Sequence, residues 1–143
     1  MRRYISRISG PMLDRMDIQI ELPSLSYEEI SAHDERAESS AVIRERVTAA
    51  RAFARERMEK NGWSGYCNAQ LDAAGIHKFC KTDEAASALL KAAYDRMGLS
   101  ARGYDRLLRV ARTIADLDKS ELICAPHIAE AIQLRSLDRK YWG

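Results

Sequence analysis

The sequence predicts an all-α fold, a helical bundle preceded by an N-terminal arm that carries one orphan strand. Apolar side chains recur every three or four residues in several segments after residue 38, which is the spacing of amphipathic helices. Capping and helix-ending residues stand at the boundaries of these segments. Residues 16–22 alone show a clear alternation of apolar and polar side chains, the pattern of a strand.

Length and composition describe one modest domain with a loose N-terminal extension. The 143 residues are 46% hydrophobic and 31% charged, which is ordinary for a soluble globular chain with a single core. The net charge of +2 is too small to predict a nucleic-acid partner from charge alone. We expect an arm over residues 1–38 and a bundle over residues 39–143.

Cysteine usage and the absence of long apolar runs predict a cytoplasmic protein with no membrane partner. The three cysteines are an odd number without a C-x-x-C pair, which suits reduced thiols better than a disulfide framework. The sequence at the N-terminus has no apolar run of the kind found in signal peptides. No stretch approaches the roughly 20 apolar residues that span a bilayer.

The strand of the arm is the segment Met-Asp-Ile-Gln-Ile-Glu-Leu at 16–22. Gly10-Pro11 interrupts the chain before it and Pro23 ends it. A lone strand cannot satisfy its own backbone groups, so this strand is expected to pair with a sheet in a larger parent protein. Residues 23–38 form a polar connection.

The first long helix is expected to begin at Ser39 or Ser40, either of which is a good N-cap, and to end at Asn61-Gly62. Its arginines are interleaved with glutamates, so local ion pairing accounts for them. One of its faces carries a regular apolar row: Ile43, Val47, Ala50, Ala54 and Met58.

A loop at 62–70 follows, and four more helices complete the bundle. A short helix spans about 71–80, and a longer one spans 83–97, buries Leu89, Leu90 and Ala93, and ends at Gly98. The next is capped by Ser100 and has a buried stripe of Tyr104, Leu107, Leu108, Ala111, Ile114 and Ala115. The last has Pro126 in its first turn and buries Ile128, Ala131 and Ile132.

Three separated segments resemble the magnesium-chelatase-like AAA+ ATPases. They are R-I-S-G-P-M-L-D-R-M-D-I at 7–18, Y-C-N-A-Q at 66–70, and L-S-A-R-G-Y-D-R-L-L-R-V-A-R-T-I-A-D-L at 99–117. The likeness covers nearly the whole chain, including R-S-L-D-R-K-Y-W at 135–142. It is closest to the C-terminal third of the competence-type ComM branch, also called the YifB group.

The resemblance implies a ring-forming, hexameric motor that uses ATP and Mg²⁺. Its partners would be the other subunits of the ring and DNA, with branch migration in natural transformation as its task. The family name suggests insertion of magnesium into a porphyrin, but these residues do not.

The sequence contains no phosphate-binding loop. None of the seven glycines lies in a G-x-x-x-x-G-K-[ST] motif, whose backbone amides cradle phosphates. We therefore expect the C-terminal piece of a larger ATPase, inactive alone and without tightly bound nucleotide. The alternative is a stand-alone helical module that binds a protein or DNA, although such a module has no use for an orphan strand.

Arg15 is the candidate catalytic residue. By resemblance, its place in L-D-R-M-D is that of the arginine finger, which reaches the γ-phosphate bound by a neighbouring subunit. A planar guanidinium of permanent charge can span two phosphoryl oxygens. The residues alone favour an ion pair of Arg15 with Asp14 or Asp17 instead. Arg7 is a weaker second candidate without an assignable role.

Arg102 is the candidate nucleotide-binding residue. It follows the Ser100 cap by two residues, at the positive end of a helix dipole, where a cation is disfavoured by about 0.3–1 kcal/mol. A phosphate there would meet free amides, the dipole and the guanidinium. The resemblance assigns this position to the sensor-2 arginine, and the alternative is a solvated arginine at a helix end.

Three other groups of residues carry less functional weight. Arg106, Arg109 and Arg112 continue along the helix of Arg102 and are expected to form a solvated or subunit-facing stripe. Cys67, His77 and Cys80 lack a fourth ligand and a known zinc spacing, so no metal site is expected. The aromatic pair Trp63 and Tyr66 is assigned to anchoring of the 62–70 loop, with binding of a partner as the alternative.

Overall fold

The structure is a computed structural model that describes residues 12, 15–31 and 37–135. Its helices are α3 (Tyr27–Ser31), α4 (Ser40–Lys60), the 3-10 helix η1 (Asn68–Gln70), α5 (Ala73–Phe79), α6 (Glu84–Met97), α7 (Ala101–Leu117) and α8 (Ala125–Gln133). No sheet forms among the described residues; an isolated parallel bridge joins Thr82 to Ile123. The predicted all-α class is confirmed.

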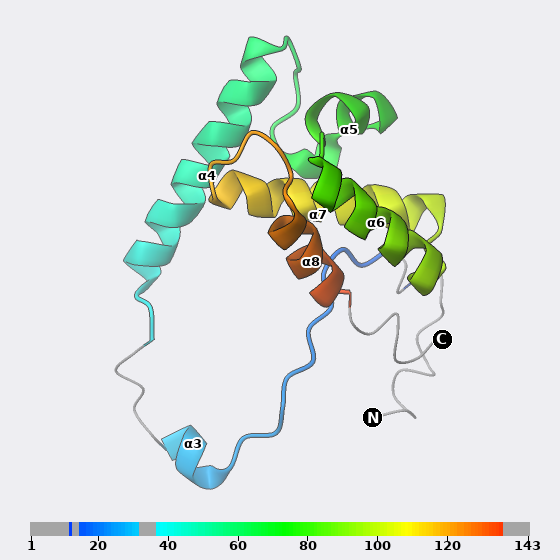
Figure 1. Cartoon of the computed structure of the whole chain (residues 1–143). Coiled ribbons are helices and arrows are strands. Elements are labelled where there is room, and N and C mark those ends of the chain that lie inside the picture. The colour runs from blue at the N-terminus through cyan, green and yellow to red at the C-terminus, as the bar shows by residue number, and fades with distance from the viewer. Residues whose placement is uncertain (1–11, 13–14, 32–36, 136–143) are drawn as a thin grey trace.

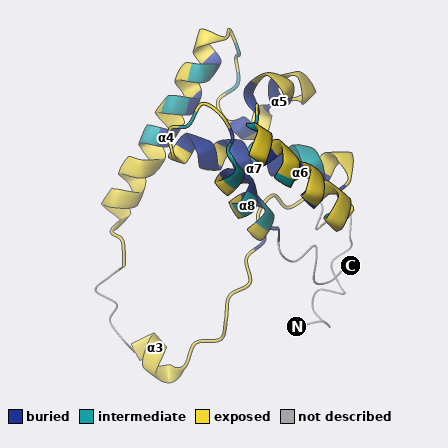
Figure 2. Ribbon diagram, in the orientation of Figure 1, coloured by how far each residue is buried: buried dark blue, intermediate teal, exposed yellow. Residues whose placement is uncertain are grey.

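Helix α7 is the centre of the bundle and packs against α4, η1, α5 and α8, while α6 packs on α8 (Figure 1). Along α7, Leu107, Ala111 and Ala115 are fully buried. Figure 2 shows that the buried residues gather around α7 and that most of α4 is exposed. The apolar row of α4 is accordingly buried only from Ala50 onward, since Ile43 and Val47 are exposed.

Local capping chemistry sets the helix boundaries close to the predicted residues. The Ser39 side chain accepts a hydrogen bond from the Val42 amide at 3.3 Å, and Ser100 accepts one from the Gly103 amide at 3.0 Å. Gly98, with φ of +59°, ends α6 in the left-handed conformation that glycine adopts without steric cost. These contacts satisfy amides and carbonyls that a helix leaves free at its ends.

The predicted strand at 16–22 is not formed, and this prediction was wrong for the chain as described. Within the described residues, its one backbone–backbone hydrogen bond runs from the Gln19 amide to the Leu134 carbonyl at 2.7 Å. Gln19 is buried, whereas its neighbours Ile18 and Ile20 are exposed. A strand needs the backbone of a second strand beside it, whereas this segment contacts Arg106 of α7 and Leu134 and Arg135, which follow α8.

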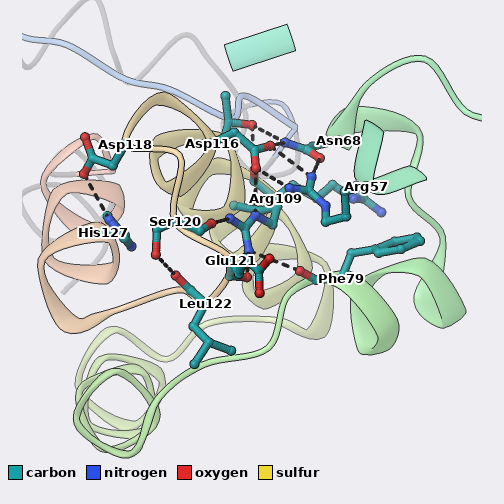
Figure 3. Close-up of polar contacts among 12 residues, drawn as sticks. Arg57, Asn68, Phe79, Arg109, Asp116, Asp118, Ser120, Glu121, Leu122 and His127 are labelled. Carbon is teal, nitrogen blue, oxygen red and sulfur yellow. Dashed lines mark hydrogen bonds and ion pairs between the residues drawn. The ribbon is translucent and has the colours of Figure 1, made fainter. Parts of the chain in front are cut away.

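A buried polar network, not predicted from the sequence, joins α4, η1 and α7. The Asp116 carboxylate accepts hydrogen bonds from Arg57, one of them at 3.0 Å, and from Asn68 at 2.8 Å (Figure 3). Arg112, one turn before Asp116 on α7, donates to the same carboxylate at 3.2 Å. Two arginines from separate helices therefore share one carboxylate inside the bundle.

The prediction that Arg112 belongs to a stripe of solvated arginines was wrong, because its side chain is completely buried. Besides Asp116, it donates to the backbone carbonyls of Phe79, Ser120 and Glu121. Burial lowers the pKa of its guanidinium, an effect that the charge of Asp116 opposes. Arg112 thus ties the turn after α7 and the end of α5 to the central helix.

We expect Asp116→Ala to destabilise the bundle by about 3 kcal/mol, because it leaves two arginines without their shared buried counter-charge. Urea unfolding followed by circular dichroism measures the loss. Asp95→Ala, an exposed aspartate on α6, is the matched control and should change the free energy of unfolding by less than about 0.5 kcal/mol. Equal effects of the two variants would contradict a structural role of the network.

The buried thiol of Cys80 should make the stability of the bundle depend on pH in the alkaline range. Burial raises its pKa from 9.0 to about 11, so the unfolded chain releases this proton first as the pH rises. The stability that this thiol contributes is complete below pH 9 and should be lost as the pH rises through about 11. Urea unfolding over this range should show a smaller alkaline loss for Cys80→Ala than for Cys67→Ala, which removes an exposed thiol.

Candidate functional site

The candidate site lies at the N-terminal end of α7. Ser100 is the N-cap of this helix of 17 residues, and its hydroxyl is bonded to the Gly103 amide. The amides of Ala101 and Arg102 in the first turn have no acceptor within the helix. The Arg102 side chain is exposed, and none of the described residues accepts a hydrogen bond from it. The first turn therefore presents amides and a free guanidinium, which together suit an anion.

Arg15, in the arm, is also exposed. Its backbone carbonyl accepts a hydrogen bond from the Arg106 guanidinium. Asp17, one of the two alternative partners considered for Arg15, forms an ion pair with Arg106 at 2.6 Å instead. Asp14, the other alternative partner, lies outside the described residues, as does Arg7. The described residues hold no acceptor for the Arg15 side chain.

Two further contacts fix the arm beside α7 and α8. Arg135 is buried and donates to the Met16 carbonyl at 3.3 Å, and the Gln19 amide donates to the Leu134 carbonyl at 2.7 Å. Figure 1 shows the arm running past the C-terminal end of α8 before it leaves the bundle. The structure thus brings the segment of Arg15 to the helix that carries Arg102.

The environment of Arg106 differs from the one that the sequence predicted. Arg106 was expected in a solvated or subunit-facing stripe, yet only 20% of its side chain is exposed. Its partners in the arm lie 89 and 91 residues away in the chain. Its position one turn after Arg102 was the available local signal, but no periodicity along α7 reveals a partner so distant.

No group of three or more His, Cys, Asp or Glu side chains converges as a metal site in the part of the chain that the structure describes. His77 and Cys67 are exposed and Cys80 is buried. The raised pKa of Cys80 keeps its thiol protonated near neutral pH, whereas metals bind the thiolate.

None of the helices over the described ranges combines the length and apolar character required to cross a membrane. The charged side chains along the longest of them, α4, illustrate why: arginines and glutamates recur throughout its 21 residues.

The chain is similar in sequence to magnesium chelatase families and to several bacterial proteins. The family described as "Magnesium chelatase, subunit ChlI C-terminal" matches residues 37–135, and that described as "Magnesium chelatase, subunit ChlI" matches residues 1–30. Competence protein ComM of Haemophilus influenzae is 40% identical over 137 residues, and protein YifB of Escherichia coli is 41% identical over 137 residues. A protein of Mycobacterium tuberculosis is 36% identical over 134 residues.

These matches cover 96%, 96% and 94% of the chain, respectively, but 26% of each relative. The chain thus spans about a quarter of the length of these relatives. The similarity extends across the candidate site, because the two family matches include both Arg15 and Arg102. The chain belongs to the magnesium-chelatase-like ComM/YifB family and corresponds to its C-terminal part.

Proposed function

We propose that this chain is the lid and sensor-2 part of a magnesium-chelatase-like AAA+ ATPase. In the proposal, the whole protein couples ATP binding and hydrolysis in a homo-oligomeric, hexameric ring to work on DNA. The observation that carries it is the exposed guanidinium of Arg102 on the first turn of α7, a helix that buries one side in the bundle core. A phosphate held at this turn would be linked rigidly to the core through α7.

The residues fit one phosphate group of a nucleotide and no more than that. The first turn of α7 offers the amides of Ala101 and Arg102 and one guanidinium, which suits phosphoryl oxygens. The described residues offer no cluster of carboxylates for Mg²⁺. When bound, ATP with Mg²⁺ would supply the phosphoryl group, and its transfer to water would release the free energy that drives the movement of the ring on DNA.

Arg15 is assigned the role of a finger that acts on the nucleotide of a neighbouring subunit. Its exposed side chain, with no acceptor among the described residues, supports this role, because a finger must be free to reach outside its own chain. An arginine supplied in this way can accelerate phosphoryl transfer by about 10³-fold or more. We propose that the lid domain spans residues 39–143 and that residues 1–38 belong to the preceding arm.

The proposed action on DNA is supported by sequence similarity to a named relative. The Haemophilus influenzae relative is named a competence protein, and we extend that association to branch migration during natural transformation. We also propose a cytoplasmic location, which the three free cysteines support.

The 143-residue chain by itself should hydrolyse no ATP above background and bind nucleotide at best with millimolar affinity. The reason is that its sequence has no phosphate-binding loop, on which ground-state affinity mainly depends. A phosphate-release assay and calorimetric titration with ATP test this. Saturable turnover by the purified chain that disappears in Arg102→Ala would overturn the assignment as a lid.

In the full-length ATPase, Arg15→Ala should abolish turnover and leave ATP binding nearly intact, because the charge is needed in the transition state. Arg102→Ala should lower turnover with a larger effect on nucleotide affinity or ring assembly. Arg55→Ala, which removes an exposed arginine of α4, is the control and should leave both properties unchanged. Turnover and nucleotide binding are measured separately for each variant.

Mixing subunits tests whether the finger acts between neighbours. Arg15→Ala subunits still bind nucleotide, and subunits without the phosphate-loop lysine still carry a finger, so some mixed interfaces should regain activity. Mixed rings that assemble but remain as inactive as either variant would show that Arg15 does not act on a neighbour's nucleotide.

A further inference from the structure

Arg106 connects the two candidate arginines within a single chain. It lies on α7 four residues after Arg102, which places the two side chains on adjacent turns of one helix face. The Arg106 guanidinium donates both to the Arg15 backbone carbonyl and to the Asp17 carboxylate, the latter at 2.6 Å. The Arg106 side chain therefore contacts both Arg15, the candidate finger, and Asp17.

Among the described residues of the arm, the contact with Arg106 is the one nearest to Arg15. Near Arg15, the arm is held by Arg106, by Arg135 at the Met16 carbonyl and by the Gln19 amide at the Leu134 carbonyl. The side chains of Ile18, Ile20 and Leu22 are exposed, so apolar packing contributes little to docking in the described structure. Polar contacts therefore contribute to the docking of residues 15–19, and that of Arg106 is the nearest to Arg15 among the described residues.

We propose that Arg106 is a positioning residue, which holds the Arg15 segment against α7 so that Arg15 reaches the nucleotide of the neighbouring subunit. This inference rests on the proposed function. It adds a route by which a phosphate at Arg102 in one subunit is coupled to hydrolysis in the next. The route is one turn of α7 followed by the contact of Arg106 with the arm.

The pairing with Asp17 explains why an arginine suits this position. Its fork of donors can serve a carbonyl and a carboxylate together with fixed geometry, whereas a lysine is a flexible point charge. Arg106→Lys should therefore weaken the docking of the arm and ATP turnover less than Arg106→Ala does. A purely structural contribution to the bundle would not produce this order, since both partners of Arg106 lie in the arm.

The first experiment uses the 143-residue chain and does not depend on ATPase activity. Hydrogen exchange is followed at the Gln19 amide, whose acceptor is the Leu134 carbonyl, and at the buried amides of α7. Arg106→Ala should accelerate exchange at Gln19 by about tenfold, the factor that a change of 1.4 kcal/mol produces, and leave α7 unchanged. Arg106→Lys should lie between, and Arg55→Ala should match the unaltered chain. Unchanged exchange at Gln19 in Arg106→Ala would overturn the proposal.

The second experiment uses the full-length ATPase. Arg106→Ala should lower kcat by about tenfold or more and change KM for ATP by less than about twofold, the signature of an interaction made only in the transition state. Mixed with subunits that lack the phosphate-loop lysine, Arg106→Ala subunits should regain activity, because the defect acts on the neighbour's nucleotide. Mixtures without recovery would place the effect of Arg106 on its own subunit's nucleotide and overturn the proposal.

The two experiments separate this inference from the proposed function. If Arg15→Ala leaves turnover unchanged, the finger assignment fails, and a positive exchange result then shows only that Arg106 docks the arm. If Arg15→Ala abolishes turnover while Arg106→Ala does not lower it, the finger assignment stands and the positioning role is overturned. Circular dichroism of each variant confirms that the bundle remains folded.

Discussion

The bundle depends on one carboxylate, Asp116, which is held between two arginines inside the protein. Arg57 reaches it from α4 and Arg112 from the preceding turn of α7, while Asn68 of η1 donates to the same group. Buried charges are costly unless they are paired and hydrogen-bonded, so the three elements are stable only in the arrangement that brings these groups together. The network thereby ties α4 and η1 to α7.

This constraint extends to the candidate site through α7. The C-terminal half of the helix is fixed by Asp116 and Arg112, and its middle is buried among apolar side chains such as Leu107 and Ala111. Its first turn, by contrast, carries the exposed Arg102 beside free amides. A rigid helix with one anchored end and one accessible end is suited to transmit an event at the accessible end. Arg106, between the two, contacts the arm that carries Arg15.

Several elements followed from local sequence. Ser39, Ser100 and Gly98 gave the helix boundaries because caps act within one turn of their own position. The buried stripe of the helix at 101–117 followed from its periodicity. The strand at 16–22 failed for the opposite reason. An alternating pattern indicates a strand with one face suited to burial, but a strand forms only when it is paired with another. No partner strand is present among the described residues of this chain.

The sequence by itself determined the helical class, the helix boundaries and, through family resemblance, Arg15 and Arg102 as the residues to examine. Only the tertiary structure decided that Arg112 is buried, that Arg57 pairs with Asp116 and not with a neighbouring glutamate, and that Arg106 holds the arm. The physical reason is distance along the chain. Caps and periodicity depend on residues within a few positions, whereas these arginines are given their roles by partners that folding alone brings near.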